Sequence, residues 1–276
     1  MPDTSLPTAE AVSDAYDRLA ALTETLGGPD LHYGYWSGPA DDTPIEEATD
    51  RLTRVVVARL AAQPGDRVLD LGCGNGRPAV TVAESTGAWV TAIDVNEHAL
   101  ERGRAWARER GVESLVSFER CDALAMPYPR DAFDGVLVFE STPHFLLEPL
   151  FTEIVRVLRP GGRVVLEAPF LRVPVTEDIG PRLAAYFEMF QVVSIESRES
   201  YAETLRAAGL RVDAVEDLTE HTEPFYGRIL ARLDTLHAEL AAEYGAEAVR
   251  WIRDGIAGCA TVPTGSVLIT ARKPFG

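Results

Sequence analysis

Short runs of β-branched and apolar residues alternate with stretches of helical periodicity, and this alternation constrains the fold more than any other feature of the chain. We expect strands at 67–72, 88–95, 115–121, 133–140, 163–170, 211–219 and 265–274. We expect helices between them at 77–86, 96–111, 147–162 and 200–210. Strands that alternate with helices form βαβ units, which right-handed crossovers arrange into a doubly wound sheet. The sequence therefore predicts an α/β fold with a seven-stranded, mainly parallel, Rossmann-like sheet.

Helical segments also precede and follow this alternation. Apolar residues recur at three- and four-residue steps in 9–28 and 44–66, and Gly27-Gly28 and Pro64-Gly65 predict where these helices end. Regularity lapses in 171–194, which indicates a lid after the fifth strand, and 224–258 is mostly helical. We expect one domain, 1–276, with an N-terminal helical cover at 8–62, a core at 63–170, and lid or cap segments at 171–198 and 224–262.

Charge and cysteine content limit the classes of partner. The net charge of −17 disfavours a nucleic-acid backbone and an anionic membrane surface, because both need basic residues. Cys73, Cys121 and Cys259 are far apart and form no ligand cluster, so we expect no zinc site or other metal. We find no signal-peptide pattern and no apolar run long enough to span a membrane, and we expect a cytoplasmic protein. The sequence leaves homo-oligomerisation open.

The first predicted strand leads into a glycine-rich loop, "DLGCGNGRP", at 70–78. Gly72, Gly74 and Gly76 have the spacing G-x-G-x-G, whereas a dinucleotide loop has G-x-G-x-x-G and a Walker loop requires a lysine. The loop is therefore a poor phosphate cradle. It still allows a ligand to approach the backbone at the carboxyl end of a strand, where open α/β sheets bind ligands.

Two carboxylates follow at the ends of the next strands. Asp94 ends the second strand, where a carboxylate accepts hydrogen bonds from ribose hydroxyls, and Asp122 ends the third, where it can accept from an adenine amine. Asp94 and Asp122, together with a glycine-rich loop that has no lysine, suit a nucleoside that carries positive charge. S-adenosylmethionine is such a ligand, and a nucleoside triphosphate is not.

The segments "VLDLGCGNG" (68–76), "AIDVN" (92–96), "CDALAMP" (121–127) and "VLRPGG" (157–162) resemble the motifs of class I S-adenosylmethionine-dependent methyltransferases. Four further segments are similar to small-molecule enzymes of natural-product pathways, of the rebeccamycin sugar O-methyltransferase type. They are "HYGYW" (32–36), "ATDRL" (48–52), "GRPAV" (76–80) and "VLITARKP" (267–274). The resemblance implies that the core binds the cofactor, with its methionine end against 70–76 and the aromatic N-terminal segment folded over it. The predicted cofactor contacts are Asp70, Gly72, Gly74, Gly76, Asp94, Val95, Asp122, Ala123, Glu140 and Tyr33.

Two residues after the fourth strand are candidates for the catalytic base. His144 is the first, because an imidazole titrates near neutral pH and a neutral hydroxyl acceptor must lose a proton. In the sugar-methyltransferase pattern two histidines follow the serine, and here Pro143 replaces the first. Glu140 is the second candidate; it can act as a base after carbon methylation, bind the cofactor's amino group, or cap the next helix. Glu167 is offset by one position from the family's aspartate and ranks below His144.

Aromatic residues predict the acceptor pocket. A tyrosine or tryptophan from "HYGYW" (32–36) can attract the sulfonium through its ring face, although the segment can equally be a packing staple. Bulky residues of the lid and cap suit a large apolar acceptor, although such residues are more often core. The predicted pocket residues are His32, Trp36, His144, Tyr186, Phe190 and Phe225.

The sequence thus predicts an enzyme that transfers a methyl group from S-adenosylmethionine to a small natural product, most simply to a hydroxyl oxygen. N- or C-methylation with Glu140 as the base remains an alternative. A protein that binds the cofactor without methyl transfer, or catalyses a pericyclic reaction, is more remote. An NAD-dependent oxidoreductase is disfavoured by the glycine spacing.

Overall fold

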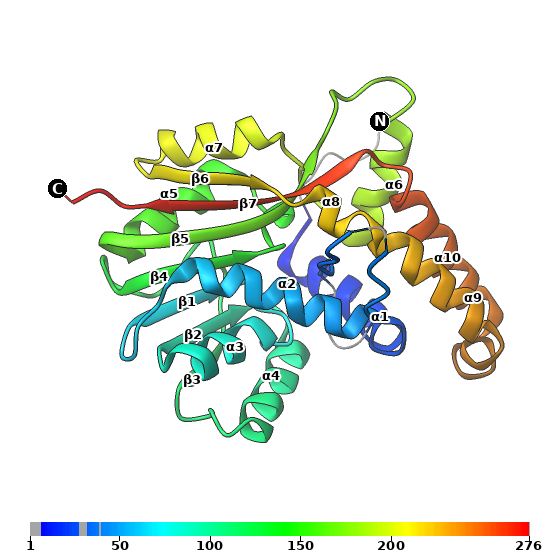
Figure 1. Ribbon diagram of the computed structural model, residues 1–276, viewed down its shortest axis with the longest axis horizontal. Coiled ribbons are helices and arrows are strands. Elements are labelled where there is room, and N and C mark those ends of the chain that lie inside the picture. The colour runs from blue at the N-terminus through cyan, green and yellow to red at the C-terminus, as the bar shows by residue number, and fades with distance from the viewer. Residues whose placement is uncertain (1–6, 28–31, 39, 276) are drawn as a thin grey trace.

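The computed structural model describes residues 7–27, 32–38 and 40–275. Its centre is a seven-stranded sheet in the order β3-β2-β1-β4-β5-β7-β6 (Figure 1). The strands are β1 (Arg67–Leu71), β2 (Trp89–Asp94), β3 (Val116–Arg120), β4 (Phe133–Phe139), β5 (Leu158–Leu171), β6 (Arg211–Asp217) and β7 (Thr264–Arg272). The first five strands are parallel, and β7 runs antiparallel to both β5 and β6. The predicted α/β class and mainly parallel sheet are confirmed.

Helices cover both faces of this sheet. On one face lie α2 (Ile45–Leu60), α3 (Arg77–Thr86) and α4 (Glu97–Glu109), whose apolar side chains form one core cluster with alternate residues of the strands. On the other face lie α5 (Leu147–Val157) and α7 (Arg198–Ala207), which pack on the remaining alternate residues. Because successive residues of a strand point to opposite faces, strands buried on both sides are apolar almost throughout, as β4 is.

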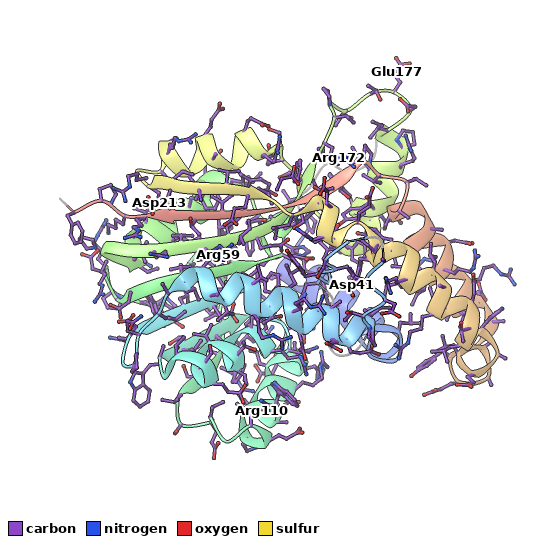
Figure 2. The ribbon with its side chains drawn as sticks, viewed as in Figure 1. Asp41, Arg59, Arg110, Arg172, Glu177 and Asp213 are labelled. Carbon is purple, nitrogen blue, oxygen red and sulfur yellow. The ribbon has the colours of Figure 1, made fainter. Side chains whose placement is uncertain are left out.

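A group of helices gathers at one end of the sheet, on the right of Figure 1. The helical cap, as we call it, consists of α6 (Gly180–Phe190), α9 (Pro224–Tyr244) and α10 (Ala246–Cys259), and α1 (Ala9–Gly27) packs against it. The short helices η1 (Thr142–His144) and α8 (Thr219–Thr222) follow β4 and β6. The loop between β5 and α6 projects from the molecule, with Glu177 near its tip (Figure 2). The predicted lid and cap segments contain these cap helices, and their role as a lid stays a prediction.

The predicted helices over 96–111 and 200–210 end at Glu109 and Ala207, and two other helix ends differ for local reasons. The helix expected over 147–162 ends at Val157, and Leu158 to Gly162 already belong to β5. Pro160 prevents the helix from continuing, because a proline lacks an N–H and disfavours helical dihedral angles at the residue before it, Arg159; Leu158 is already extended. The helix before Pro64 ends at Leu60, where Ala61 adopts the left-handed conformation. The first helix extends to Gly27, and the predicted stop at Gly28 lies outside the described residues.

Candidate active site

A cavity of about 520 Å³ lies at the carboxyl ends of β1, β2 and β4. Residues from the glycine loop, from the segments after β2 and β3, and from α1 form its walls. The wall contains most of the predicted cofactor contacts, namely Asp70, Gly72, Gly74, Asp94, Val95, Ala123 and Glu140. Topology explains the convergence, since the carboxyl ends of adjacent parallel strands meet at one edge of the sheet.

The glycine loop turns sharply between β1 and α3 and lies against the neighbouring strands. The backbone N–H groups of Gly72 and Cys73 both donate to the Ile93 carbonyl, at 2.9 and 3.0 Å. Gly72 has φ +69°, and a Cβ on it would lie 2.5 Å from the Cβ of Ser141. Glycine is therefore required at this close approach of β1 and β4.

Gly76 serves packing and is not part of the cavity wall. It caps α3 with φ +73°, and a Cβ on it would lie 2.2 Å from the Phe118 ring. The structure therefore gives Gly76 a packing role, and its contact with the cofactor stays a prediction. Its missing side chain lets α3 approach β3 closely, which is the usual role of the last glycine in such loops.

Asp94 holds the loop in place from the end of β2. One carboxylate oxygen accepts from the Gly74 N–H at 2.8 Å and the other from the Asn96 N–H at 2.9 Å. Burial raises the pKa of this carboxyl group. A carboxylate has about four acceptor positions, so Asp94 can accept further hydrogen bonds from a ligand in the cavity.

Asp70 belongs to the same wall. The side chain is buried, and Oδ2 has no hydrogen-bond partner among the described residues. Burial, and secondarily the nearby Asp94, raise the pKa of Asp70 to about 7. A buried acceptor without a partner is costly, and a cationic donor in the cavity would satisfy it.

Asp122 does not reach this cavity. Its neighbours Cys121 and Ala123 border it, whereas the Asp122 side chain is exposed and accepts from the Leu124 N–H at 2.8 Å. Asp122 does follow the end of β3, as the sequence predicts. The turn after β3 directs its carboxylate along the loop, and the adenine contact stays a prediction.

A second, smaller cavity of about 80 Å³ adjoins the first under the helical cap. Both cavities share Tyr16, Glu140 and His144 in their walls. The remaining wall is apolar or aromatic and includes the predicted pocket residues Tyr186, Phe190 and Phe225. A polar junction thus joins a large cavity to an apolar one, as a site for two ligands requires.

His144 lies at this junction with both ring nitrogens in hydrogen bonds. Its Nδ1 is 3.2 Å from the Gln191 carbonyl oxygen, and its Nε2 is 3.0 Å from the Tyr16 hydroxyl. Because a carbonyl oxygen only accepts, Nδ1 carries the proton of the neutral ring and Nε2 accepts from Tyr16. Burial lowers the pKa of His144, which favours this neutral form.

Glu140 connects the junction to two other parts of the chain. Its Oε1 accepts from the Tyr33 backbone N–H at 2.7 Å, and its own N–H donates to the Glu167 carbonyl at 2.8 Å. Burial and the Glu167 charge raise the pKa of Glu140 well above its usual range. The residue has φ +49°, an unusual conformation for a side chain of this size.

Glu167 is fully buried on the face of β5 that also carries Pro169 of the second cavity. Its Oε1 accepts from the Ser266 hydroxyl at 2.5 Å, and Oε2 has no partner in the described part of the chain. Burial raises the pKa of Glu167 to about 8. It lies behind Glu140 and outside both cavity walls.

The aromatic segment divides among three environments. His32 borders the first cavity and stacks on Phe139, with ring centroids 4.4 Å apart. Tyr33 borders the second cavity, and its predicted contact with the cofactor stays a prediction. Trp36 borders neither cavity: it is completely buried and its indole N–H donates to the Thr43 carbonyl at 2.9 Å. The predicted pocket role of Trp36 is corrected to an anchoring one.

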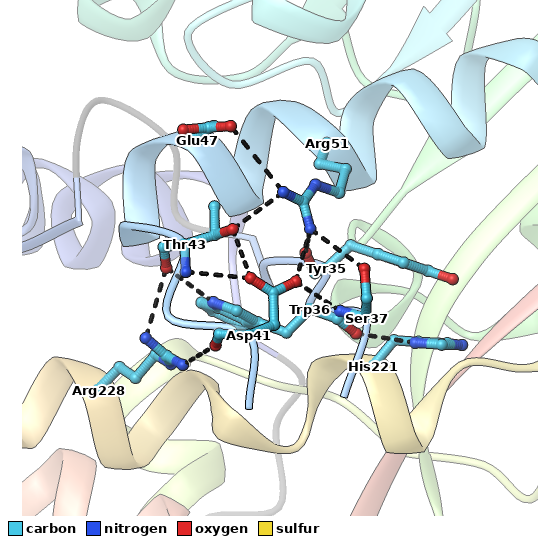
Figure 3. Close-up of polar contacts among 9 residues, drawn as sticks. All are labelled: Tyr35, Trp36, Ser37, Asp41, Thr43, Glu47, Arg51, His221 and Arg228. Atoms are coloured by element: carbon cyan, nitrogen blue, oxygen red, sulfur yellow. Dashed lines mark hydrogen bonds and ion pairs between the residues drawn. The ribbon is translucent and has the colours of Figure 1, made fainter. Parts of the chain in front are cut away.

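Polar contacts around Asp41 hold this segment (Figure 3). Asp41 accepts from the Ser37 N–H and from Arg51 of α2, both at 2.7 Å. His221 donates to the Trp36 carbonyl at 2.8 Å, and Tyr35 stacks on its ring. These contacts fix the segment that delivers Tyr33 to Glu140.

Comparison with known proteins identifies the family. Residues 68–162 match the family model described as a methyltransferase domain. The chain is 35% identical to 27-O-demethylrifamycin SV methyltransferase of Amycolatopsis mediterranei (strain S699), over 97% of this chain and 98% of that one. It is 33% identical to methyltransferase GfsG of Streptomyces halstedii, over 95% and 94% of the two chains. The chain belongs to the class I S-adenosylmethionine-dependent methyltransferases.

Among solved structures, this methyltransferase is similar to the crystal structure of the [4+2]-cyclase SpnF. The TM-score is 0.84 and the identity 31%, over 98% of each chain. The relatives and this neighbour match nearly the whole chain, so the similarity includes the N-terminal helices and the cap as well as the core.

The residues of the first cavity fit S-adenosylmethionine, the cofactor of the family. The unpartnered oxygen of Asp70 suits the cationic methionine end, and Asp94 suits the ribose hydroxyls. Gly74 has open space where a Cβ would lie, which leaves room for the ligand. Among the described residues, no helix has the length and apolar character needed to cross a membrane.

Sequence reasoning missed Tyr16 and the Gln191 carbonyl. Tyr16 lies four residues after Val12, within the helical period that was assigned to plain packing. A lone polar group on an otherwise apolar face was the available signal. The Gln191 carbonyl had none, because a backbone atom in a left-handed turn after α6 has no sequence pattern of its own.

Proposed function

We propose that this methyltransferase methylates a hydroxyl oxygen of a small, largely apolar natural product, with His144 as the general base. The observation that carries the proposal is the position of His144 in the wall common to both cavities, with its Nδ1 at the Gln191 carbonyl. A base at this point lies between a cofactor in the large cavity and an acceptor in the apolar one.

S-adenosylmethionine supplies an electrophilic methyl group on a sulfonium, so the chain's own work is binding, alignment and proton removal. Asp70, Gly72, Gly74 and Asp94 would hold the cofactor. The apolar second cavity would hold the reacting part of the acceptor away from water. Alignment of two bound reactants contributes about 7–11 kcal/mol to barrier lowering in well-oriented systems.

His144 is set up to accept a proton. The Gln191 carbonyl fixes the tautomer, so the lone pair of Nε2 faces the Tyr16 hydroxyl. An acceptor hydroxyl that takes the place of the Tyr16 hydroxyl at Nε2 loses its proton there as the oxygen–methyl bond forms. Proton removal of this kind is typically worth a factor of 10²–10⁴ in rate.

The relatives support an oxygen acceptor in a natural product. One relative acts, by its name, on 27-O-demethylrifamycin SV, and it covers nearly the whole of this chain. Glu140 is less available as a base for N- or C-methylation, because its raised pKa favours the protonated form and its Oε1 is engaged by Tyr33. The acceptor of this chain is then an oxygenated molecule rather than an amine or an activated carbon.

A second candidate function follows from the similarity to the [4+2]-cyclase SpnF. In that case the acceptor would cyclise in the apolar cavity, and no methyl group would leave the cofactor. The two functions differ in whether labelled methyl appears in the product.

The test is a transfer assay with methyl-labelled S-adenosylmethionine and a panel of demethylated natural products, beginning with 27-O-demethylrifamycin SV. We expect labelled product from the wild type and a 10²- to 10⁴-fold lower kcat from His144→Gln. His237→Gln, at an exposed position of α9, is the matched control. An unchanged kcat in His144→Gln would remove His144 as the base. Unlabelled cyclised product would favour the second candidate.

A further inference from the structure

The second cavity contains a single carboxyl group, Glu140, and no lysine or arginine among its described wall residues. Directly behind Glu140 lies Glu167, on the neighbouring strand and without any exposure. The backbone bond from Glu140 to the Glu167 carbonyl ties the two residues together. Two residues with carboxyl groups thus lie side by side, one half-buried and one fully buried, and the described wall of the second cavity has no lysine or arginine.

Glu140 also borders the first cavity, whose wall includes Arg77 and Arg102 and which would hold the cofactor. On the side of the second cavity, the described groups that face Glu140 supply no positive charge. They are Tyr16 from α1, Tyr33 from the aromatic segment, His144 from η1, Glu167 from β5, Tyr186 from α6 and Tyr226 from α9. His144 is neutral for the reason given above, since burial lowers its pKa. Two negative charges without a cation are strongly disfavoured in such surroundings.

The hydrogen-bond donors near Glu140 and Glu167 already have partners. Glu167 already receives the Ser266 hydroxyl at 2.5 Å, and Glu140 receives the Tyr33 N–H at 2.7 Å. The tyrosine hydroxyls of the junction pair with other groups: Tyr16 with His144 at 3.0 Å, and Tyr33 with Tyr226 at 3.3 Å. A proton on Glu140 would make it a donor at the junction, because a neutral carboxyl group has one O–H.

We propose that Glu140 is a neutral carboxylic acid that donates a hydrogen bond to a second oxygen of the acceptor, beside the hydroxyl that His144 deprotonates. The chemical class of the acceptor follows from having Glu140 as a hydrogen-bond donor beside His144 as the base. The acceptor carries a carbonyl, ether or hydroxyl oxygen within a few bonds of the methylated oxygen. An ammonium group would instead ionise Glu140, and a diphosphate would meet no cation in this wall.

This inference rests on the proposed function for the identity of the methylated atom, but its first test is independent of methyl transfer. The infrared spectrum of the full-length protein at pH 7 should contain the C=O stretching band of a neutral carboxylic acid that Glu140→Gln removes. Glu153→Gln is the matched control, because the pKa of Glu153 is lowered by its ion pair with Arg156. Equal spectra of wild type and Glu140→Gln in this band would overturn the proposal.

The acceptor class is tested with three small probes of similar shape, 2-methoxyethanol, 1-butanol and n-butylammonium, added to protein saturated with S-adenosylhomocysteine. We expect 2-methoxyethanol to shift the Glu140 band and 1-butanol to leave it. The preference for 2-methoxyethanol over 1-butanol should fall about two- to tenfold in Glu140→Leu and persist in Glu140→Gln, whose amide also donates. Tightest binding of n-butylammonium with loss of the acid band would overturn the proposal in favour of an amine acceptor. Labelled-methyl transfer, measured separately, reports only on the proposed function.

Discussion

The unpartnered oxygen of Asp70 leads to a prediction about how the cofactor site responds to pH. Burial and the nearby Asp94 raise the pKa of Asp70 from 3.8 to about 7. One pKa unit corresponds to about 1.4 kcal/mol, so the ligand-free fold disfavours the charged form by about 4 kcal/mol. A cationic ligand reverses this preference, because it supplies the missing partner of Oδ2.

Binding of S-adenosylhomocysteine, which retains the ammonium group, should therefore release a proton from Asp70. At pH 6 most of the free protein is protonated there, so release should approach one proton per site; at pH 8.5 it should approach zero. Below pH 7 the affinity should fall by up to about tenfold per pH unit. The measurement is isothermal titration calorimetry in buffers of different ionisation enthalpy, which counts the protons directly.

The variant Asp70→Asn isolates the contribution of this carboxylate. A hydrogen bond to a charged group is worth about 1.5–3 kcal/mol, so affinity at pH 8 should fall about 10- to 150-fold and lose its pH dependence. The ligand-free variant should unfold at the same or a higher temperature at pH 8, since a buried charge has been removed. Asp254→Asn, on the exposed face of α10, is the control. Unchanged affinity in Asp70→Asn, or binding without proton release at pH 6, would refute the reasoning.

Three further predictions concern the loop, the carboxyl pair and the exposed aspartate. Gly76→Ala should lower the free energy of unfolding in urea by about 2–4 kcal/mol, because its Cβ would overlap Phe118, whereas Gly74→Ala, which also has positive φ but open space, should lose only about 1 kcal/mol. Equal losses in the two variants would contradict the packing role of Gly76. The pKa of Glu167 is raised to about 8, so the folded protein holds the Glu167 proton more tightly than the unfolded chain does. This proton binding stabilises the fold fully below the unfolded pKa near 4.5, and the stabilisation is lost as pH rises to about 8. Wild type should thus lose up to about 1.4 kcal/mol per pH unit over this window relative to Glu167→Gln in urea titrations, and parallel pH profiles would count against it. Asp122→Asn should change S-adenosylhomocysteine affinity by less than about threefold, because the carboxylate is exposed and bonded to Leu124; a larger loss by calorimetry would support the adenine contact predicted from sequence.

Local sequence patterns determined the elements and their order. Short β-branched and apolar runs indicated strands, and apolar spacing with a period of 3.6 indicated helices, because burial on one or both faces is imposed residue by residue. The glycine loop and Asp94 were predictable for a similar reason: a turn with positive φ and a carboxylate at a strand end are local requirements of the fold. These residues are enough to identify the cofactor half of the site.

The second half of the site depended on contacts between distant segments. Tyr16 and His144 are 128 positions apart, and the direction of Asp122 depends on the turn after β3 rather than on the strand that precedes it. Trp36 and Tyr33 lie three residues apart, yet one is an anchor in the core and the other borders the acceptor cavity. Side-chain direction, burial and the proximity of Glu140 to Glu167 arise only when helices and strands pack, because each depends on neighbours that no local pattern specifies. The sequence alone therefore determined the fold and the methyl donor, and the tertiary structure determined which groups meet at the junction where the acceptor would bind.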